Sequence, residues 1–498
     1  MKNKDMLKVS ARQLRLIFFV VMAGLLAAPL TRAVELTLGE ALDIALNRTP
    51  RGGIIKGNLE VAEQQFNAKR INFILPAISI NGSVPSYSND ETYRFFGGAT
   101  EKSLYKTRDL GFSSFIRLEQ SLITGGDLEI TANLTKNDER YPNTGMAGGI
   151  IDEDNRQGYF NFSYKQPLLK PSDSKYELNN LKDDREIARY TRMEDEGALK
   201  KEVAEAFMGI IRSRLNLEIT RDKTGKARLQ VGIDSAKFAD GVLSEEDFLA
   251  SQSALLDAEL ERFEAETEAS EKNRQLAMLL DIDPSTTIDP VEPEIFDHYN
   301  EEQTRAIIDN WENSAAIKKA EHQYQKSRRQ ANYSSGSHGL TGDLTANYSF
   351  GRGTIEREIG GLREPNDDIN TNSWGISLNF TFPIWDGGSS GAAVKAAQFQ
   401  ADQARLEYES KEKSAKAEII NLVNSLDVSY RRMEIIKKQI ELADNKMKIA
   451  NDRYQDGQIS YLEFLENKIF YQQTKDKYLE ELNAYLANRF SLEGKFIN

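Results

Sequence analysis

Apolar residues recur every seven positions along the C-terminal part of this 498-residue chain. One such row runs from Ile419 through Leu426 and Met433 to Tyr454, with a second row beside it. All twelve prolines lie outside two stretches, 172–283 and 384–498. A repeat near 3.5 residues in proline-free sequence is typical of long helices packed as coiled coils. The pattern predicts two pairs of long helices, the second pair broken at Gly457.

Alternating apolar and polar residues mark four principal strand segments elsewhere in the chain. These segments are 78–84, 160–164, 344–350 and 376–382. Period two with aromatic enrichment is typical of strands, and 110–135 adds one or two candidates. The segments 91–109, 136–157 and 351–371 are rich in Gly, Asn, Asp and Thr, which favours loops. Helices are predicted before the strands of each half, at about 37–70 and 301–330.

An internal repeat relates the two halves of the chain. The sequence KFADGVLS at 237–244 recurs as RYQDGQIS at 453–460, and both copies continue to a Phe-Leu pair. Because a repeat determines architecture, we predict two copies of one unit that ends in a long helical hairpin. The first copy spans 34–283, with its turn near 241. A linker at 284–300 precedes the second copy, 301–498, with its turn near 457.

Residues 1–33 have the features of a secretory signal peptide. A basic segment precedes an apolar stretch at 16–28, and a small residue, Ala33, stands at the expected cleavage site. An uncleaved N-terminal anchor is the alternative. No later segment approaches the ~20 apolar residues of a transmembrane helix.

Composition narrows the function further. The chain has no cysteine, which excludes disulfides, thiolate metal sites and cysteine nucleophiles. Its formal net charge is −13, so nucleic acid is not an expected partner, because phosphate contacts need a basic face. The three histidines are scattered, and no phosphate loop or nucleophile elbow occurs. We therefore expect no enzyme activity, no metal and no cofactor.

Four principal strands cannot close a barrel alone, and an open sheet edge is not tolerated in lipid. If the aromatic strands contact membrane lipid, several chains must pool them. A narrow apolar seam on so long a helix likewise requires neighbouring helices along its length.

In these features the chain resembles the TolC-type outer-membrane efflux protein family. The resemblance rests on LTLGEALDIALN at 36–47, QPL at 166–168, FPIWDGG at 382–388 and the two glycine turns. These motifs occur in the family's order and cover nearly the whole chain after residue 33. The long segment from about 91 to 157 departs from the family pattern and suggests extra β structure or an enlarged surface loop.

The resemblance implies an α+β membrane protein that forms a homotrimer in the outer membrane of a Gram-negative bacterium. Each subunit would contribute four strands to a twelve-stranded β-barrel and helices to a periplasmic coiled-coil tunnel. The trimer would be the passive duct of a tripartite efflux or secretion system, joined to a periplasmic adaptor (membrane fusion) protein and an inner-membrane transporter. Its cargo stays open among drugs, metal ions, polysaccharides and proteins, the last as in type I secretion.

The family also implies two sets of candidate functional residues. The adaptor would dock at the two turns, at Lys237, Phe238, Gly241, Leu243, Ser244, Arg453, Tyr454, Gly457, Ile459 and Ser460. Carboxylates at the closed tunnel end would form the periplasmic gate, namely Asp247, Glu463 and Glu466. Rings of such groups attract cations. Asp247 and Glu463 also fit helix caps three residues after a serine, so both interpretations stay open for them.

A function from another class remains as an alternative, a soluble periplasmic coiled-coil scaffold or adaptor. Such a protein would not need alternating aromatic strands, and an adaptor would be expected to have one helical hairpin instead of two matched ones. The strands therefore favour the duct.

Overall fold

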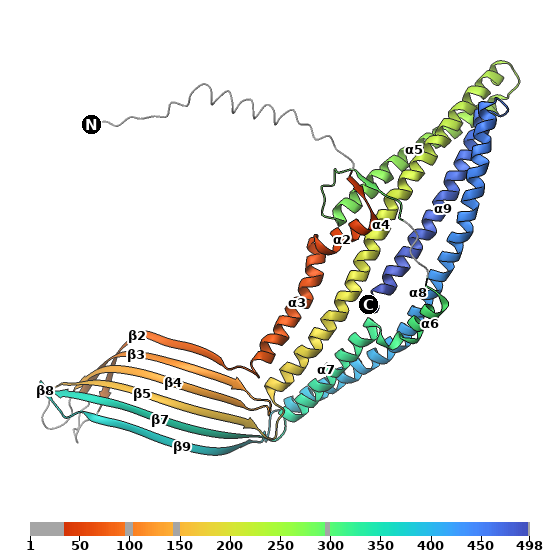
Figure 1. Cartoon of the computed structure of the whole chain (residues 1–498). Coiled ribbons are helices and arrows are strands. Elements are labelled where there is room, and N and C mark those ends of the chain that lie inside the picture. The colour runs from red at the N-terminus through yellow and green to blue at the C-terminus, as the bar shows by residue number, and fades with distance from the viewer. Residues whose placement is uncertain (1–33, 95–102, 143–149, 294–298, 497–498) are drawn as a thin grey trace, which may run out of the picture. The chain divides into compact units, whose positions relative to one another are not determined.

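The computed structural model describes residues 34–94, 103–142, 150–293 and 299–496 (Figure 1). The predicted signal peptide, 1–33, lies outside the described residues, as do parts of the segment 91–157 and of the linker 284–300. The described chain is a mixed helix and strand protein that divides into two compact units. Unit 1 comprises residues up to Gly57, Thr191–Ala315 and Ser414–Asn498, and unit 2 comprises Asn58–Tyr190 and Ala316–Lys413.

Unit 2 contains one long antiparallel sheet in which six strands lie in the order β2-β3-β4-β5-β7-β9. Their bounds are β2 Ala77–Arg94, β3 Ser103–Ser121, β4 Asp127–Pro142, β5 Ile150–Pro167, β7 Thr341–Ile359 and β9 Asp367–Thr381, and a two-residue strand, β8 Leu362–Arg363, pairs with the end of β7. The sheet has more than the four principal strands expected, because β3 and β4 form an additional long hairpin over the region 110–135, where one or two further strands were candidates. The predicted loops are also largely strand.

Cross-strand charge pairs explain why such polar segments form strands. Arg140 lies directly opposite Asp152, with its Nε 3.0 Å from the carboxylate, and Lys106 lies opposite Glu91 at 2.6 Å. Opposite charges that face each other across a ladder stabilise the pairing. Turn-forming composition predicted loops here, because composition does not reveal that each charge pairs with an opposite charge on another strand.

Register gives the sheet two different faces. Directly paired residues share a face, so one row crosses all six strands as Ile78, Leu118, Ile130, Phe162, Tyr348 and Trp374. The adjacent row on the other face reads Ser79, Arg117, Thr131, Asn161, Ser349 and Ser373. Hydrogen bonds join side chains on this polar face, such as Ser349 to Asn161 at 2.6 Å. In these rows one face is apolar and the other carries mostly hydroxyl and amide groups, whereas toward Arg140 and Asp152 the first face becomes charged.

Four helices adjoin this sheet in unit 2, in the order α3-α4-α7-α8. Their full bounds are α3 Pro50–Ile71, α4 Asp173–Ala239, α7 Ala315–Ser337 and α8 Ser389–Gln455. The contacts that set the order are Arg185 over the Phe66 ring at 4.5 Å, Arg329 with Asp183 at 2.7 Å, and the Tyr324 and Tyr408 rings stacked at 6.4 Å. Each helix connects to a strand at the same end of the sheet, which we call the helix end; the opposite end is the far end.

Unit 1 is helical and holds the apolar core. It contains α2 Leu38–Asn47, α5 Glu245–Leu279, α6 Glu301–Asp309, the 3-10 helix η1 Trp311–Asn313, α9 Tyr461–Glu493 and the remaining parts of α4 and α8. A short parallel pair joins β1 Val34–Leu36 to β6 Ile288–Pro290. The single helix predicted at 301–330 is interrupted between α6 and α7.

The first part of the predicted coiled-coil seam is buried within unit 1, whereas Tyr454 at its end is 39% exposed. Ile419, Leu426 and Met433 of the heptad row are buried, together with Tyr485 and Leu479 of α9. No helix among the described residues is both long enough and apolar enough to cross a membrane.

Candidate functional site

The two glycine turns have the same backbone geometry. Gly241 and Gly457 both have φ of +70°, in the left-handed region that favours glycine. The N–H of the following residue donates to the carbonyl five positions back at 2.8 Å, Val242 to Lys237 and Gln458 to Arg453. This is the Schellman-type ending of a helix, and it reverses the chain between α4 and α5 and between α8 and α9.

A serine then begins the next helix at each turn. The Ser244 hydroxyl accepts from the Asp247 N–H at 3.1 Å, and the Ser460 hydroxyl accepts from the Glu463 N–H at 3.2 Å. Both serines have extended backbones and are N-caps, as predicted from the sequence.

Stacked aromatic rings close both turns. Phe238 and Phe248 stack with centroids 5.2 Å apart, and Tyr454 and Phe464 occupy the matching positions at 5.7 Å. Leu243 and its counterpart Ile459 are half-buried beneath the turns. These contacts pack the two helices of each hairpin together beside the turn.

The rest of both turns is exposed. Lys237, Gly241, Ser244, Arg453, Gly457 and Ser460 all lie at the surface of the chain. Within the described residues, the structure records no ion pair for the side chains of Lys237 and Arg453. Each tip therefore exposes a cation and part of an aromatic ring.

The three candidate gate carboxylates have different surroundings. Asp247 accepts a hydrogen bond from the Ser244 hydroxyl at 2.6 Å, so its side chain belongs to the helix cap. Glu466 on α9 forms an ion pair with Lys226 on α4 at 2.7 Å, a structural role that the sequence did not indicate. For the carboxylate of Glu463 the structure records no partner within the described residues.

The Glu466–Lys226 pair belongs to a row of polar and charged pairs between α4 and α9. Arg212 holds Asp476 through two hydrogen bonds, at 3.0 and 3.2 Å. Further along, Asp222 accepts from Lys468 and from Gln472 at 2.9 Å. These pairs join the two hairpins of unit 1. Sequence reasoning missed them because the charged positions are visible but their partners on a distant helix are not.

Two exposed apolar rows follow the helices of unit 1 outside this core. Leu249, Leu256 and Phe263 recur every seven residues on α5. Val428, Ile435, Leu442 and Ile449 do the same on α8. A heptad row on a helix surface is the pattern of a coiled-coil seam, so each row is suited to pack against a further helix.

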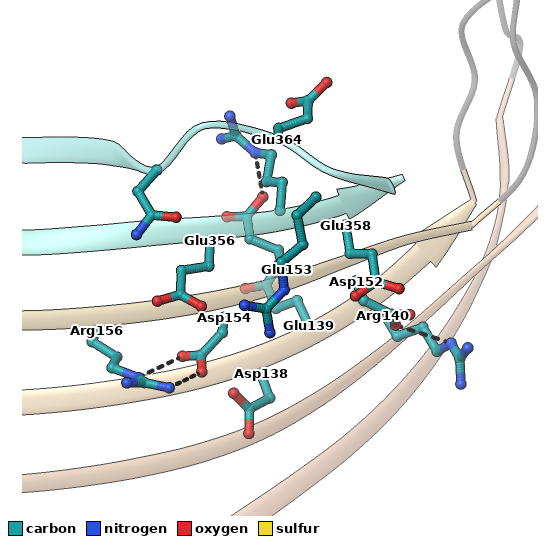
Figure 2. Close-up of a pocket in the computed structure, with 13 residues that line it drawn as sticks. Asp138, Glu139, Arg140, Asp152, Glu153, Asp154, Arg156, Glu356, Glu358 and Glu364 are labelled. Carbon is teal, nitrogen blue, oxygen red and sulfur yellow. Dashed lines mark hydrogen bonds and ion pairs between the residues drawn. The ribbon is translucent and has the colours of Figure 1, made fainter. Parts of the chain in front are cut away.

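Charged side chains gather at the far end of the sheet in unit 2 (Figure 2). They line a shallow hollow over β4, β5 and β7, with more carboxylates than guanidiniums. Arg357 bridges Glu153 at 3.0 Å and Asp367 at 2.7 Å, and Arg156 pairs with Asp154. Within the residues that the structure describes, no group of three or more His, Asp or Glu side chains is placed to bind a metal ion.

Comparison with known proteins gives consistent matches. Residues 309–494 match the family model described as outer membrane efflux protein. Nodulation protein T of Rhizobium leguminosarum bv. trifolii is 27% identical over 107 residues, which is 22% of this chain and 23% of that protein. Outer membrane protein OprJ of Pseudomonas aeruginosa is 27% identical over 114 residues, 23% of each chain. The aligned regions thus span less than a quarter of these relatives' length.

The fold is similar over a much larger region. The structure of the outer membrane protein VceC from Vibrio cholerae aligns with a TM-score of 0.57 and covers 93% of this chain and 97% of that one, at 14% identity. At this identity the likeness concerns the fold. It includes both the long helices and the strands, so the N-terminal half that the family model leaves unmatched has the same general architecture.

Proposed function

We propose that this chain, whose residues 309–494 match the outer membrane efflux protein family model, is an outer-membrane duct of a tripartite efflux or secretion system. The duct lies in the outer membrane of a Gram-negative bacterium and extends into the periplasm. It passively conducts cargo delivered by an inner-membrane transporter and a periplasmic adaptor. It performs no catalysis.

The observation that carries this proposal is the sheet with one apolar and one polar face. Alternation of this kind on strands of 15 to 19 residues suits a wall with lipid on one side and water on the other. A membrane-spanning strand needs only about 9–11 residues, so these strands are long enough to cross and continue beyond the bilayer. The edges β2 and β9 are open within one chain and need partners in lipid.

The helices support the same assembly. In a homotrimer, the exposed heptad rows of α5 and α8 pack against neighbouring copies, and the helices form a periplasmic coiled-coil tunnel. The two halves of each chain act as structural repeats, since both contain a hairpin with the same turn geometry. Closure of the sheets into one barrel removes every open edge.

We place adaptor docking at the two hairpin tips. Their matched geometry supports this, because a trimer then presents equivalent surfaces of cation, glycine and aromatic ring. Asp247, Glu463 and Glu466 form the periplasmic gate in this proposal. Glu463 is the strongest gate candidate of the three, because its carboxylate makes neither the helix-cap contact of Asp247 nor the α4–α9 ion pair of Glu466.

The native mass of protein extracted from an outer-membrane fraction tests the proposal. A complex of three chains plus detergent, which forms ion-conducting pores in planar bilayers, is the expected result. A monomer or dimer recovered without detergent would contradict the duct and favour a soluble periplasmic scaffold.

A second experiment addresses the docking tips. Charged substitution at Gly241 or Gly457 should abolish export while the trimer remains intact, because each glycine lies on an exposed turn away from the core. The matched control is Gly225→Asp on α4, where nothing lies within 4 Å of an added Cβ. Normal export by trimeric Gly241 and Gly457 variants would exclude the tips as docking sites.

A further inference from the structure

The additional hairpin β3–β4 departs from the four strands per subunit that the family resemblance implies. One explanation is a surface extension beyond the membrane, and the other is a wider membrane wall. The distinction depends on whether β3 and β4 carry the same apolar band, at the same height, as the other strands.

The register shows that they do. In the apolar row described above, Leu118 of β3 and Ile130 of β4 lie between Ile78 of β2 and Phe162 of β5. The next row toward the far end continues through Ile116 and Ala132. In this second row only Asn372 of β9 is polar, and both rows are apolar on β3 and β4, so the hairpin lies at the same depth as its neighbours.

The dimensions of unit 2 agree with six strands in the wall. Strands about 4.8 Å apart and tilted by about 40° each occupy about 6 Å of a barrel's circumference, so six strands cover about 38 Å. The four helices α3, α4, α7 and α8, at a spacing of about 9 Å, cover about 36 Å. Four strands would cover only about 25 Å. Six strands therefore match the arc of the helices that continue from them.

Strand directions also permit closure with further copies of this chain. Six alternating strands leave the edges β2 and β9 running in opposite directions, so β2 of one copy meets β9 of the next in antiparallel pairing. Both edges expose apolar side chains on the same face, with Ile80 75% and Trp374 76% exposed in the single chain. A second copy is the occupant that continues both the hydrogen-bond ladder and the apolar band.

We propose that this chain contributes six strands to an eighteen-stranded barrel, joined between copies by β2 and β9. The number eighteen rests on the trimer of the proposed function. Barrel diameter grows roughly linearly with strand number, so this lumen is about 1.5 times wider than that of a twelve-stranded barrel. Its wall is lined mainly by Ser, Thr and Asn. The duct therefore admits bulky polar cargo, of a cross-section that twelve strands would exclude.

Cysteine labelling of the full-length protein in outer-membrane vesicles tests the wall directly, because the native chain has no cysteine. Ile130→Cys and Thr131→Cys lie on β4, and Tyr348→Cys and Ser349→Cys are their controls in the same two rows on β7. We expect a lipid-soluble maleimide to label Ile130→Cys and Tyr348→Cys alike. A water-soluble maleimide should label Thr131→Cys and Ser349→Cys. Reaction of Ile130→Cys with the water-soluble reagent, while Tyr348→Cys stays protected, would overturn the proposal.

Cross-linking tests the β2–β9 junction between copies. Ser79→Cys on β2 should form a disulfide with at least one of Ser373→Cys, Ser377→Cys or Asn379→Cys on β9, giving covalent dimers and trimers. Ser113→Cys on the interior strand β3 is the control and should not cross-link to the same positions. A native trimer in which no β2–β9 pair cross-links would contradict the junction.

Pore-size measurements distinguish a failure of the eighteen-stranded barrel from a failure of the proposed duct function. Entry of graded poly(ethylene glycols) into the open pore should extend to a polymer radius about 1.5 times the limit of a twelve-stranded relative. If labelling and cross-linking give the expected results but the protein does not conduct ions, the duct is rejected and the six-stranded contribution to the barrel wall is retained. Conductance with a twelve-strand size limit would retain the duct and reject the wider barrel.

Discussion

Arg212 on α4 holds the carboxylate of Asp476 on α9 through two parallel hydrogen bonds, at 3.0 and 3.2 Å. The contact joins the two helical hairpins inside unit 1, and Glu480 lies 3.6 Å from the same guanidinium. Hydrogen bonding to Asp476 raises the pKa of Arg212, so the guanidinium remains charged throughout the physiological range. Planar, two-point pairing of this kind is stronger than a single flexible ion pair.

Loss of this pair should destabilise unit 1. Arg212→Met leaves a partly buried carboxylate without its main partner, and we expect a loss of about 1–2 kcal/mol in the free energy of unfolding. A double-mutant cycle with Asp476→Asn, followed by chemical denaturation of the detergent-solubilised protein, measures the coupling. The control is Arg305→Met, since the Arg305–Glu301 pair is highly exposed and should contribute almost nothing. Equal effects of the two arginine substitutions would contradict the interpretation.

Close backbone contact makes Gly197 sensitive to the smallest side chain. A Cβ on this residue of α4 would lie 2.6 Å from the Cα of Gly494, at the end of α9. Gly197→Ala should therefore destabilise by about 1–3 kcal/mol, because one of two packed helices must move. Gly225→Ala, on the same helix with nothing within 4 Å, should instead stabilise by about 0.5–1 kcal/mol. Thermal denaturation of both variants measures the contrast, and shifts of the same sign would refute it.

The helical hairpins were largely predictable from local sequence. Proline exclusion, the heptad row through Leu426 and Met433, and the glycine and serine of each turn are signals read within a few residues. Local rules decide such elements, because the stabilising partner lies on the same helix or one turn away. The structure accordingly places the turns at Gly241 and Gly457.

The strands and the gate needed information that the sequence does not carry locally. Residues around Arg140 and Asp152 have a loop-like composition, yet they pair as strands because each charge finds its opposite across the ladder. Glu466 was identified only as an acid after a turn, since nothing in the sequence assigns it Lys226 as a partner. Pairings between distant segments determine both outcomes.

The start of α8 should weaken at acid pH through Asp386. Its carboxylate accepts from the backbone N–H groups of Gly388 and Ser390 at 2.9 and 2.7 Å. Hydrogen bonding by the Ser390 side chain and backbone lowers the pKa of Asp386 below its usual value of 3.8. A lowered folded-state pKa means that the stabilisation is complete above about pH 4 and is lost as pH falls through the folded-state pKa.

Comparison of the native chain with Asp386→Asn measures this effect. The difference in denaturation midpoint between them should be constant near neutral pH and should shrink below pH ~4, as the native carboxyl becomes protonated. Glu302→Gln, on the exposed first turn of α6, is a control for general charge removal. A difference that stays constant down to pH ~2 would show that Asp386 does not titrate as stated.

The exposed heptad row of α8 should determine assembly. Leu442→Lys places a charge in the middle of the row and should shift the protein from trimer to monomer, while the fold of unit 1 stays intact because Leu442 is 71% exposed in the single chain. Lys437→Leu, at an exposed position of α8 that lies outside the row, removes a charge instead and serves as the control. Native mass measurement with circular dichroism separates assembly from folding. A Leu442→Lys trimer of undiminished stability would exclude this row from the interface.

The proposed gate carboxylates should contribute unequally to ion selectivity. Glu463→Gln removes a charge that has no partner among the residues that the structure describes, so it should lower cation selectivity more than Glu466→Gln, whose charge Lys226 already compensates. Asp247→Asn should mainly weaken the helix cap, by about 1 kcal/mol, because its carboxylate accepts from Ser244. Reversal potentials in a salt gradient measure selectivity for each variant and for the triple variant. Ser460→Ala disrupts a cap without changing charge and is the matched control. If the triple variant keeps the native reversal potential, these carboxylates do not form the gate.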